Sequence, residues 1–214
     1  MTFKRIVPGG WKDEIAVVGG QFFCLQMPAN PDAVFGHLEA HPDAAAELGD
    51  DPYWTQVWPT ALRLSEDVLA AAWQPGSEAI ELGCGIGLVG LAALARGMHV
   101  TLSDSSPLAV ELAVENARRN GFSAVEGFVL DWRSPPQRTY DVILASDVVY
   151  DVALHKPLLS TLRSLSHPNT TIWIGDCGRG ASEAFLATAK RQWHMELRDG
   201  GRDYQLICLQ RLEQ

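Results

Sequence analysis

The segment ELGCGIG at residues 81–87 constrains the fold of this chain more than any other part of the sequence. An apolar run that ends at Leu82 precedes three glycines at alternating positions, and a helix-forming run, residues 88–96, follows. Such glycines let the backbone turn tightly and bring N–H groups close to a ligand. The start of the next helix adds unpaired N–H donors and the positive end of its dipole. This pattern predicts a site for the anionic or polar part of a nucleotide-like cofactor.

Strand-like and helix-like runs alternate through most of the remaining chain. Apolar runs without alternation, such as VILA at residues 142–145, are typical of a parallel sheet that helices cover on both faces. The expected strands are residues 78–82, 98–103, 125–130, 140–146 and 171–175, and the expected helices are residues 59–73, 88–96, 107–120, 153–165 and 181–193. The runs 195–198 and 204–209 predict a closing antiparallel hairpin. We therefore expect an α/β fold, a Rossmann-like, doubly wound sheet of seven mostly parallel strands.

The first fifty residues have a different rhythm. Two strand-like runs, residues 14–18 and 21–26, flank Gly19-Gly20 and predict a hairpin. Asn30-Pro31 has the residue types of a helix start, and a helix is expected to about Ala40. We interpret residues 1–52 as an N-terminal extension of hairpin and short helices, and residues 53–214 as the main domain.

Composition excludes several classes of protein. The net charge of −9 does not favour a nucleic-acid partner. Four scattered cysteines without a C-x-x-C pair, and histidines without metal-ligand spacing, predict neither disulfides nor a metal site. Without an apolar run of membrane-spanning length or a signal peptide, we expect a cytoplasmic protein that does not enter a membrane.

The glycine loop allows two interpretations. Residues 85–90 also satisfy G-x-G-x-x-G, and Asp104 follows about twenty residues later, which is the fingerprint of a dinucleotide site in an NAD-dependent oxidoreductase. The alternative is the S-adenosylmethionine site of class I methyltransferases, whose loop reads acid-x-G-x-G-x-G. Glu81, Gly83, Gly85 and Gly87 fill that pattern completely.

Three features favour the methyl donor. A carboxylate at Glu81 suits a ligand that carries an ammonium group, whereas a dinucleotide site needs no charge there. Asp131-Trp132 ends the third strand, where a carboxylate can accept from an adenine amino group and an aromatic ring can pack on the base. The third feature is the closing hairpin, which the seven-stranded methyltransferase sheet has and a simple dinucleotide-binding domain lacks. Asp104 can accept both ribose hydroxyls in either case, and Cys84, Ser105 and Ser146 are expected to line the same pocket, Cys84 as a small filler.

Three segments resemble the family 16 seven-strand methyltransferases, which include many protein-lysine methyltransferases. They are PYWTQVWP at residues 52–59, Leu130-Asp131-Trp132, and SDVVYD at residues 146–151 with its D-x-x-Y motif. The segment GDCGR at residues 175–179 is similar to the group of electron-transfer-flavoprotein β-subunit lysine methyltransferases and bacterial relatives, with Cys177 where proline is expected. The resemblance covers about residues 52–180. It implies that residues 53–214 form an S-adenosylmethionine-dependent methyltransferase domain that methylates a nitrogen, with protein lysine as the leading acceptor.

Asp147 and Tyr150 are the predicted catalytic residues, because they follow the fourth strand at the edge of the sheet where open α/β folds bind ligands. A carboxylate raises the pKa of a neighbouring lysine, so Asp147 is assigned to orienting and retaining the amine rather than to deprotonating it. At least one of Trp54 and Trp58 is expected to line the cofactor pocket. A small-molecule amine methyltransferase and a cofactor-binding protein without catalysis remain alternatives.

Overall fold

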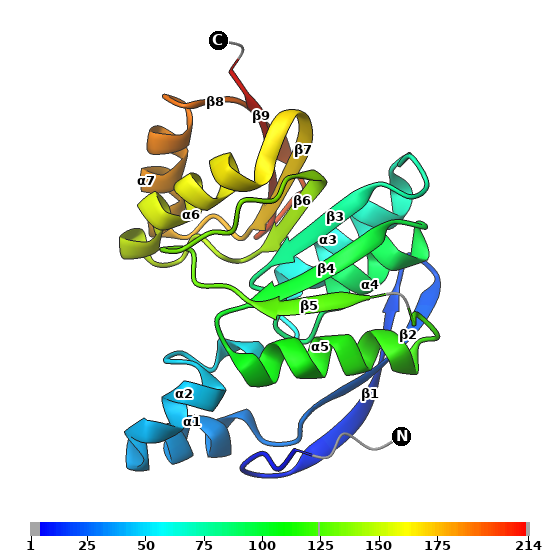
Figure 1. Ribbon diagram of the computed structural model, residues 1–214, viewed down its shortest axis with the longest axis vertical. Helices are drawn as coiled ribbons and strands as arrows, with labels where there is room; N and C mark the ends of the chain where they lie inside the picture. The colour runs from blue at the N-terminus through cyan, green and yellow to red at the C-terminus, as the bar shows by residue number, and fades with distance from the viewer. Residues whose placement is uncertain (1–4, 124, 213–214) are drawn as a thin grey trace.

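The computed structural model describes residues 5–123 and 125–212, and its centre is a seven-stranded sheet (Figure 1). The strands lie in the order β5-β4-β3-β6-β7-β9-β8. Their bounds are β3 (Glu78–Leu82), β4 (His99–Asp104), β5 (Glu126–Val129), β6 (Tyr140–Ser146), β7 (Ser166–Asp176), β8 (Trp193–Asp199) and β9 (Gln205–Arg211). Neighbouring strands are parallel from β5 to β7, and β9 pairs antiparallel with both β7 and β8. The predicted fold class, including the closing hairpin, is confirmed.

Helices cover both faces of this sheet. One buried cluster joins residues of α3 (Pro59–Ala70), α4 (Leu88–Ala95) and α5 (Pro107–Arg119), and a second joins residues of α6 (Val152–Leu165) and α7 (Gly180–Ala189). Successive residues of one strand contribute to opposite clusters: Ala79 packs in the first and Ile80 in the second. This double burial explains why the strands are apolar without alternation. No helix among the described residues is long and apolar enough to cross a bilayer.

The N-terminal segment folds as a two-stranded sheet followed by short helices. Its elements are β1 (Trp11–Val18), β2 (Gln21–Pro28), α1 (Pro31–Ala40), η1 (Pro42–Ala44), α2 (Ala45–Leu48) and η2 (Tyr53–Thr55). As expected, the Asn30 side chain caps α1 and accepts a hydrogen bond from the Ala33 N–H at 3.3 Å.

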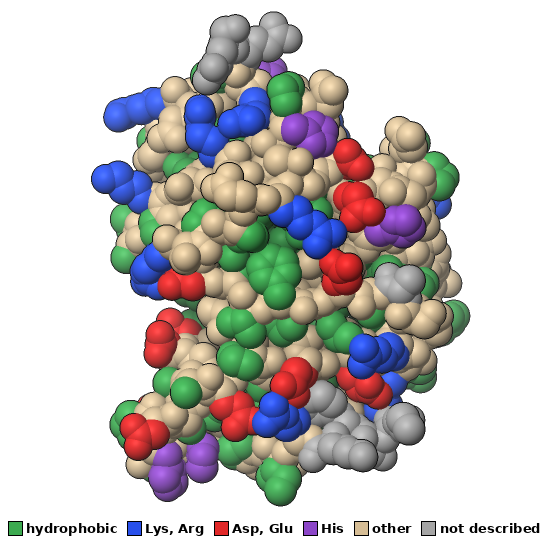
Figure 2. Space-filling model, in the orientation of Figure 1, with side chains coloured by type: hydrophobic (Ala, Val, Ile, Leu, Met, Phe, Trp, Pro, Cys, Tyr) green, Lys and Arg blue, Asp and Glu red, His purple; other side chains and the backbone are tan. Residues whose placement is uncertain are grey.

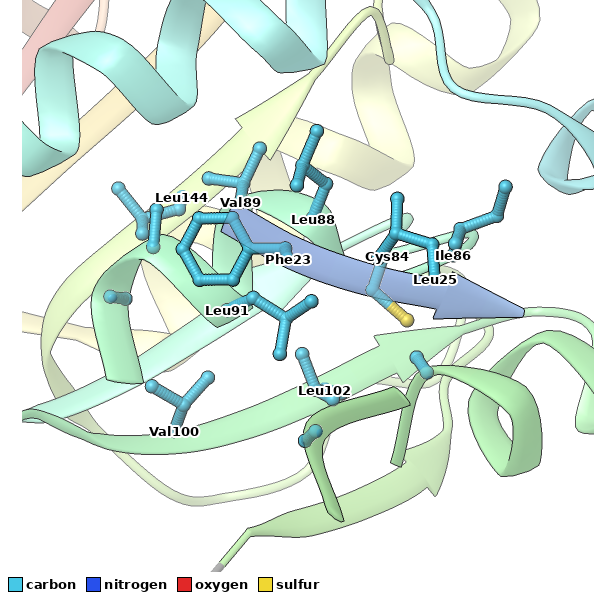
Figure 3. Packing of buried hydrophobic residues seen from close by; sticks show 14 of the residues in the cluster. Phe23, Leu25, Cys84, Ile86, Leu88, Val89, Leu91, Val100, Leu102 and Leu144 are labelled. Carbon is cyan, nitrogen blue, oxygen red and sulfur yellow. The ribbon is translucent and has the colours of Figure 1, made fainter. Parts of the chain in front are cut away.

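The hairpin packs on the first helical layer. Phe23 and Leu25 of β2 are buried, Phe23 beside Val89 and Leu91 of α4 and Leu25 near Cys84 and Ile86 of the glycine loop (Figure 3). The buried Asn116 side chain of α5 exchanges two hydrogen bonds with the backbone of Gln26, at 2.8 and 3.0 Å. The same side chain donates to the Ile86 carbonyl at 3.1 Å. The Asn116 side chain therefore holds both the hairpin and the glycine loop in place.

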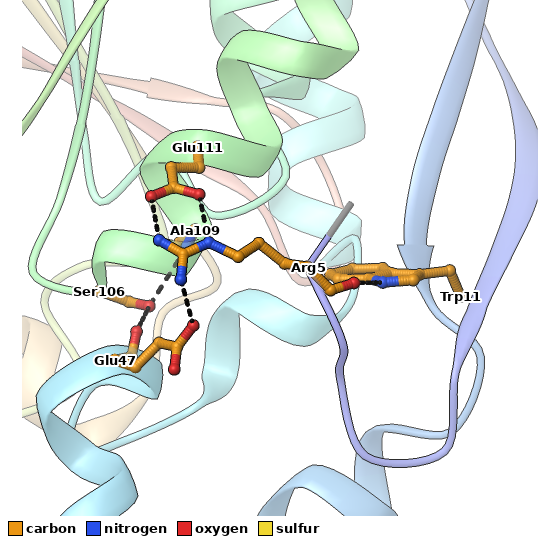
Figure 4. A network of polar contacts seen from close by, with 6 residues as sticks. All are labelled: Arg5, Trp11, Glu47, Ser106, Ala109 and Glu111. Carbon is orange, nitrogen blue, oxygen red and sulfur yellow. Dashed lines mark hydrogen bonds and ion pairs between the residues drawn. The ribbon is translucent and has the colours of Figure 1, made fainter. Parts of the chain in front are cut away.

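A polar network fixes α2 against α5 (Figure 4). The Arg5 guanidinium donates to both carboxylate oxygens of Glu111, at 2.6 and 2.9 Å, and to Glu47 at 3.0 Å. Ser106 caps α5 at the Ala109 N–H and donates to the Glu47 carbonyl at 3.2 Å. This network holds the segment that precedes η2, which contributes to the site described below.

Strand β1 begins at Trp11, three residues before its expected start. Three other predicted boundaries are wrong for a tertiary reason. Helix α3 ends at Ala70 rather than near Trp73, whose ring packs against Trp173 at 4.8 Å. Helix α7 ends at Ala189, and the buried Trp193 begins β8 instead. Strand β7 begins five residues before Thr171, because β6 and β7 pair across an irregularity and the Thr170 hydroxyl donates to the Tyr140 carbonyl at 2.6 Å.

Candidate cofactor and acceptor pocket

A cavity of about 400 Å³ opens at the carboxyl ends of β3, β4 and β6. Strand β3 lies between β4 and β6, so the chain continues to one side of β3 and later returns to its other side. Open α/β sheets bind ligands in the crevice at such a change of direction. The volume falls in the range of about 300–1,000 Å³ that small-molecule pockets occupy. Thirteen of the fourteen predicted site residues line it: Trp54, Trp58, Glu81, Gly83, Cys84, Gly85, Asp104, Ser105, Asp131, Trp132, Ser146, Asp147 and Tyr150.

Gly87, the remaining predicted residue, begins α4 from a left-handed conformation with φ of 89°. A Cβ on this residue would lie 2.9 Å from the Cβ of Ala113, so its backbone packs tightly on α5. Gly85, which does line the cavity, also has positive φ, 50°. A Cβ on Gly85 would lie 3.4 Å from the Trp54 Cα. The loop is thus held between α5 and the tryptophan segment.

Glu81 is a buried carboxyl group at the end of β3. Its Oε2 accepts a hydrogen bond from the Gly90 N–H at 2.8 Å, and burial raises its pKa to about 8. No ion pair with Glu81 occurs among the described residues. Since the residue also lines the cavity, a ligand ammonium beside it would favour its ionised form and pair with it.

Asp104 ends β4 on the opposite side of the glycine loop. Its two carboxylate oxygens accept the N–H groups of Gly85 and Ser106, each at 3.0 Å, and burial raises its pKa. These bonds orient the carboxylate and leave further acceptor capacity, because an ionised carboxylate has about four lone-pair positions. A ribose diol would find acceptors here.

Trp132 and Asp131 form another wall of the cavity. The Trp132 ring lies against the glycine loop, 3.9 Å from the position of a Cβ on Gly83. The Asp131 carboxylate is largely exposed and accepts the Arg133 N–H at 2.9 Å. A flat ring beside an exposed carboxylate suits a purine with an amino group.

Aromatic residues line the side toward α3. The Trp54 indole is buried and donates to the Leu48 carbonyl at 2.7 Å, and the Trp58 indole donates to the Tyr53 carbonyl at 2.9 Å. Tyr53 lies edge-on to Trp58 and to Tyr150, with ring centroids 6.1 and 5.4 Å apart. Both tryptophans therefore line the cavity, and Tyr53, which sequence reasoning missed, joins them to Tyr150.

Asp147 has an unusual backbone and a charged partner. It is a non-glycine residue with φ of 54°, and its N–H donates to the Gly175 carbonyl at 2.8 Å. Its side chain is only 7% exposed and pairs with Arg179 at 3.1 Å, while the Cys177 thiol donates to its other oxygen at 3.4 Å. Strained residues held by their surroundings are concentrated at functional sites. Sequence reasoning did not foresee these two partners, because they come from the segment after β7.

Tyr150 remains a protonated donor at neutral pH. Burial and nearby acidic groups, Asp51 foremost, raise its pKa to about 12. The neighbouring Asp151 caps α6 by accepting the Ala153 N–H at 2.8 Å, the structural role that its position suggested.

The cavity is strongly acidic. Seven carboxyl side chains line it against one basic side chain, Arg133; the seven are Asp50, Asp51, Glu81, Asp104, Asp131, Asp147 and Asp151. Asp50 and Asp51 were missed by sequence reasoning. The sequence does indicate an acidic surface here, since residues 13–62 contain eight acidic residues and neither lysine nor arginine. Figure 2 shows red and purple side chains without blue over α1 and α2 at the lower left.

Comparisons with known proteins identify the family of the chain. A family model described as lysine methyltransferase matches residues 47–192. EEF1A lysine methyltransferase 3 of Mus musculus is 34% identical over 130 residues, 57% of this chain and 56% of that protein. Histone-arginine methyltransferase METTL23 of Homo sapiens is 32% identical over 129 residues, 55% of this chain and 66% of that protein. The electron transfer flavoprotein beta subunit lysine methyltransferase of Danio rerio is 29% identical over 136 residues, 62% of this chain and 53% of that protein.

The aligned chain thus spans 53% to 66% of the length of these curated relatives. Among solved structures, the N-methyltransferase NodS from Bradyrhizobium japonicum, in complex with S-adenosyl-L-homocysteine, has a TM-score of 0.58 at 19% identity. The match covers 81% of this chain and 98% of that one, and shows a shared fold. Because the family model matches well over half of the sequence, the chain belongs to the lysine methyltransferase family of S-adenosylmethionine-dependent methyltransferases, and the predicted family is confirmed.

Proposed function

We propose that the chain is an S-adenosylmethionine-dependent methyltransferase that acts on a nitrogen, with a lysine side chain of a protein as the acceptor. The observation that carries the choice of acceptor is the excess of carboxyl groups around the cavity, seven against one basic side chain. Such a wall attracts and retains a cation and disfavours phosphate-rich nucleic acid. Lysine and arginine side chains are the cations that proteins offer.

The residues around the glycine loop fit the proposed cofactor. Glu81 is a cavity-lining carboxyl without a cationic partner among the described residues, and it suits the ammonium of the methionine part. Asp104 suits the ribose hydroxyls, and the pair Asp131 and Trp132 suits the adenine. The bound cofactor supplies an electrophilic methyl group on a sulfonium, and no metal is required for that chemistry.

The acceptor residues position the amine. We assign Asp147 to the retention of the incoming ammonium, because its carboxylate is mostly buried yet lines the cavity. Tyr150 keeps its proton at neutral pH and offers a hydroxyl for a hydrogen bond that aligns the amine nitrogen. Alignment of donor and acceptor supplies most of the catalysis in such a displacement. Proton loss from the ammonium is left to solvent or to desolvation, since a carboxylate opposes it.

The N-terminal segment is proposed to contribute to acceptor choice. Asp50, Asp51 and Tyr53 reach the cavity from the region before α3. Since residues 13–62 carry no basic side chain, a basic stretch of an acceptor protein would meet little repulsion there. We also propose a reducing compartment such as the cytoplasm, because the four cysteines carry free thiols.

Two measurements test this proposal. S-adenosylhomocysteine should bind the purified protein in calorimetry and NAD should not; the opposite order would remove the cofactor assignment. Lysate from cells that lack the protein should then gain label from a radioactive methyl donor when the protein is added. Mass spectrometry of the labelled band identifies the modified residue, and label on an oxygen, an arginine or a metabolite would overturn the lysine acceptor.

A further inference from the structure

Arg179 holds the position that an acceptor cation is expected to take. Its guanidinium donates to the Asp147 carboxylate at 3.1 Å, and its central carbon lies 5.8 Å from the centre of the Trp58 ring. A carboxylate and an aromatic face are the two groups that bind an ammonium. Both of these side chains line the cavity, whereas Arg179 reaches them from the segment between β7 and α7.

We propose that Arg179 is an internal competitor for the acceptor, which occupies the subsite formed by Asp147 and Trp58 and yields it only to another cation. This inference rests on the proposed function, since it concerns the acceptor end of the same cavity. Arg179 then determines specificity for the acceptor, because a neutral group cannot replace its guanidinium beside the Asp147 carboxylate.

The difference in burial between the two partners supports an exchange of cations. The Asp147 side chain is 7% exposed, while that of Arg179 is 50% exposed. If Arg179 left without a replacement, a mostly buried carboxylate would lose its only cation among the described residues, which is costly. Arg179 itself returns to water at small cost. The subsite therefore releases Arg179 when an ammonium arrives.

The other contacts of Asp147 stay in place during this exchange. The Cys177 thiol donates to the oxygen that does not bind Arg179. Burial and the nearby carboxylate raise the pKa of Cys177, so the thiol keeps its proton and continues to donate. One oxygen is thus held by the protein, and the other is left for a cation.

The local backbone gives Arg179 room to leave. Gly178 and Gly180 flank it, and apart from their chain neighbours no heavy atom lies within 4 Å of a Cβ built on either glycine. Arg179 precedes the first residue of α7, so its displacement does not require that the helix unfold. The exchange therefore needs only a rotation of one side chain at the start of the helix.

A titration with butylammonium chloride, followed by NMR at the Trp58 indole N–H, tests the competition without a cofactor. Arg179→Met should lower the dissociation constant roughly two- to fivefold, the effect of a partly exposed ion pair. Arg179→Lys should bind as the wild type does, and neutral 1-pentanol should gain nothing. Arg198→Met is the matched control, since Arg198 also pairs with a carboxylate, Glu196 at 2.9 Å, and lies 5.8 Å from the Trp173 ring outside the cavity.

Unchanged or weaker binding in Arg179→Met, or no binding in either protein, would overturn the proposal and leave Arg179 as a fixed link between Trp58 and Asp147. A second measurement needs no variant: the Arg179 Nε–H signal of the wild type should move toward that of a free arginine as butylammonium is added. A signal that stays in place would also overturn it. If the butylammonium experiments fail while S-adenosylhomocysteine binding and methyl transfer are normal, only the competition by Arg179 is refuted. If S-adenosylhomocysteine binding and methyl transfer themselves fail, the proposed function is refuted.

Discussion

The carboxylate of Glu81 in β3 accepts a hydrogen bond of 2.8 Å from the backbone N–H of Gly90 in α4. A Cβ on Gly90 would lie 2.8 Å from that oxygen and 2.3 Å from the Leu102 side chain. A glycine is therefore needed at position 90 because α4 and the sheet approach each other closely. It does not indicate that a pyrophosphate binds there. This is why the sequence satisfies the dinucleotide fingerprint, whose third glycine serves the same packing.

Gly90→Ala should destabilise the protein by about 1–3 kcal/mol, because the added methyl overpacks the contact between α4 and the sheet. Urea denaturation monitored by circular dichroism measures the change. Gly36→Ala is the control: Gly36 lies within α1 with nothing within 4 Å of a Cβ, so alanine should stabilise the protein by about 0.5–1 kcal/mol. Equal effects of the two substitutions would contradict the close approach at Gly90.

Glu81 should make the cofactor-free protein less stable as pH rises. Its pKa is about 8 in the folded protein and 4.5 ordinarily, so between these values the folded protein retains a proton that the unfolded chain releases. The contribution of Glu81 to the free energy of unfolding should therefore be highest below pH 4.5 and decline toward pH 8, by at most about 1.4 kcal/mol per pH unit. Glu81→Gln should remove most of this slope in urea titrations between pH 5 and 8.

Asp104 adds a contribution of the same sign, since burial raises its pKa too. Glu196→Gln serves as the control for Glu81→Gln. The pKa of Glu196 is lowered by its hydrogen bond to Arg198 on the surface, so this variant should keep the decline. If Glu81→Gln and the wild type decline in parallel, Glu81 is ionised in the folded protein.

Gly85→Val should weaken S-adenosylhomocysteine binding at least a hundredfold, because a branched side chain at φ of 50° is strained and projects into the loop beside Trp54. Calorimetry gives the affinity. Gly121→Val carries similar backbone strain at φ of 86°, with open space around it and no place in the cavity wall. Gly121→Val should lose stability but keep its affinity for S-adenosylhomocysteine. Normal affinity in Gly85→Val would show that the glycine loop is not part of the proposed site.

Asp147→Asn should abolish methyl transfer to the amine while S-adenosylhomocysteine affinity stays within about threefold of the wild type. Asparagine tolerates the left-handed backbone at this position, so the loss is one of charge rather than of fold. Turnover on the acceptor found by mass spectrometry measures the effect. Asp203→Asn is the matched control, because Asp203 is also an aspartate in the left-handed conformation, with φ of 58°, and does not line the cavity. Comparable turnover in the two variants would refute the assignment of Asp147.

Most residues proposed to bind the cofactor can be recognised from short segments of the sequence. The three alternating glycines, the acidic residue two positions before them and the carboxylates that end the next two strands are each read from a short segment. Parallel strands bring their carboxyl ends to one edge, so Glu81, Asp104 and Asp131 had to meet once the strands were identified. The apolar strands and the closing hairpin determined the fold class in the same way.

The proposed acceptor end of the cavity depends on contacts that no short segment contains. The pairing of β6 with β7 brings Asp147 beside Gly175 and so beside Arg179, and the packing of α2 on α5 carries Asp50 and Asp51 to the cavity. Boundaries such as that of α3 at Ala70 likewise depend on a ring contact between Trp73 and Trp173. Hydrophobic periodicity and turn residues act within a few positions along the chain, whereas charge pairs and ring contacts depend on distances in space. The sequence by itself therefore determined the fold and the residues proposed to hold the methyl donor, and only the tertiary structure decided which groups lie at the proposed acceptor end of the cavity.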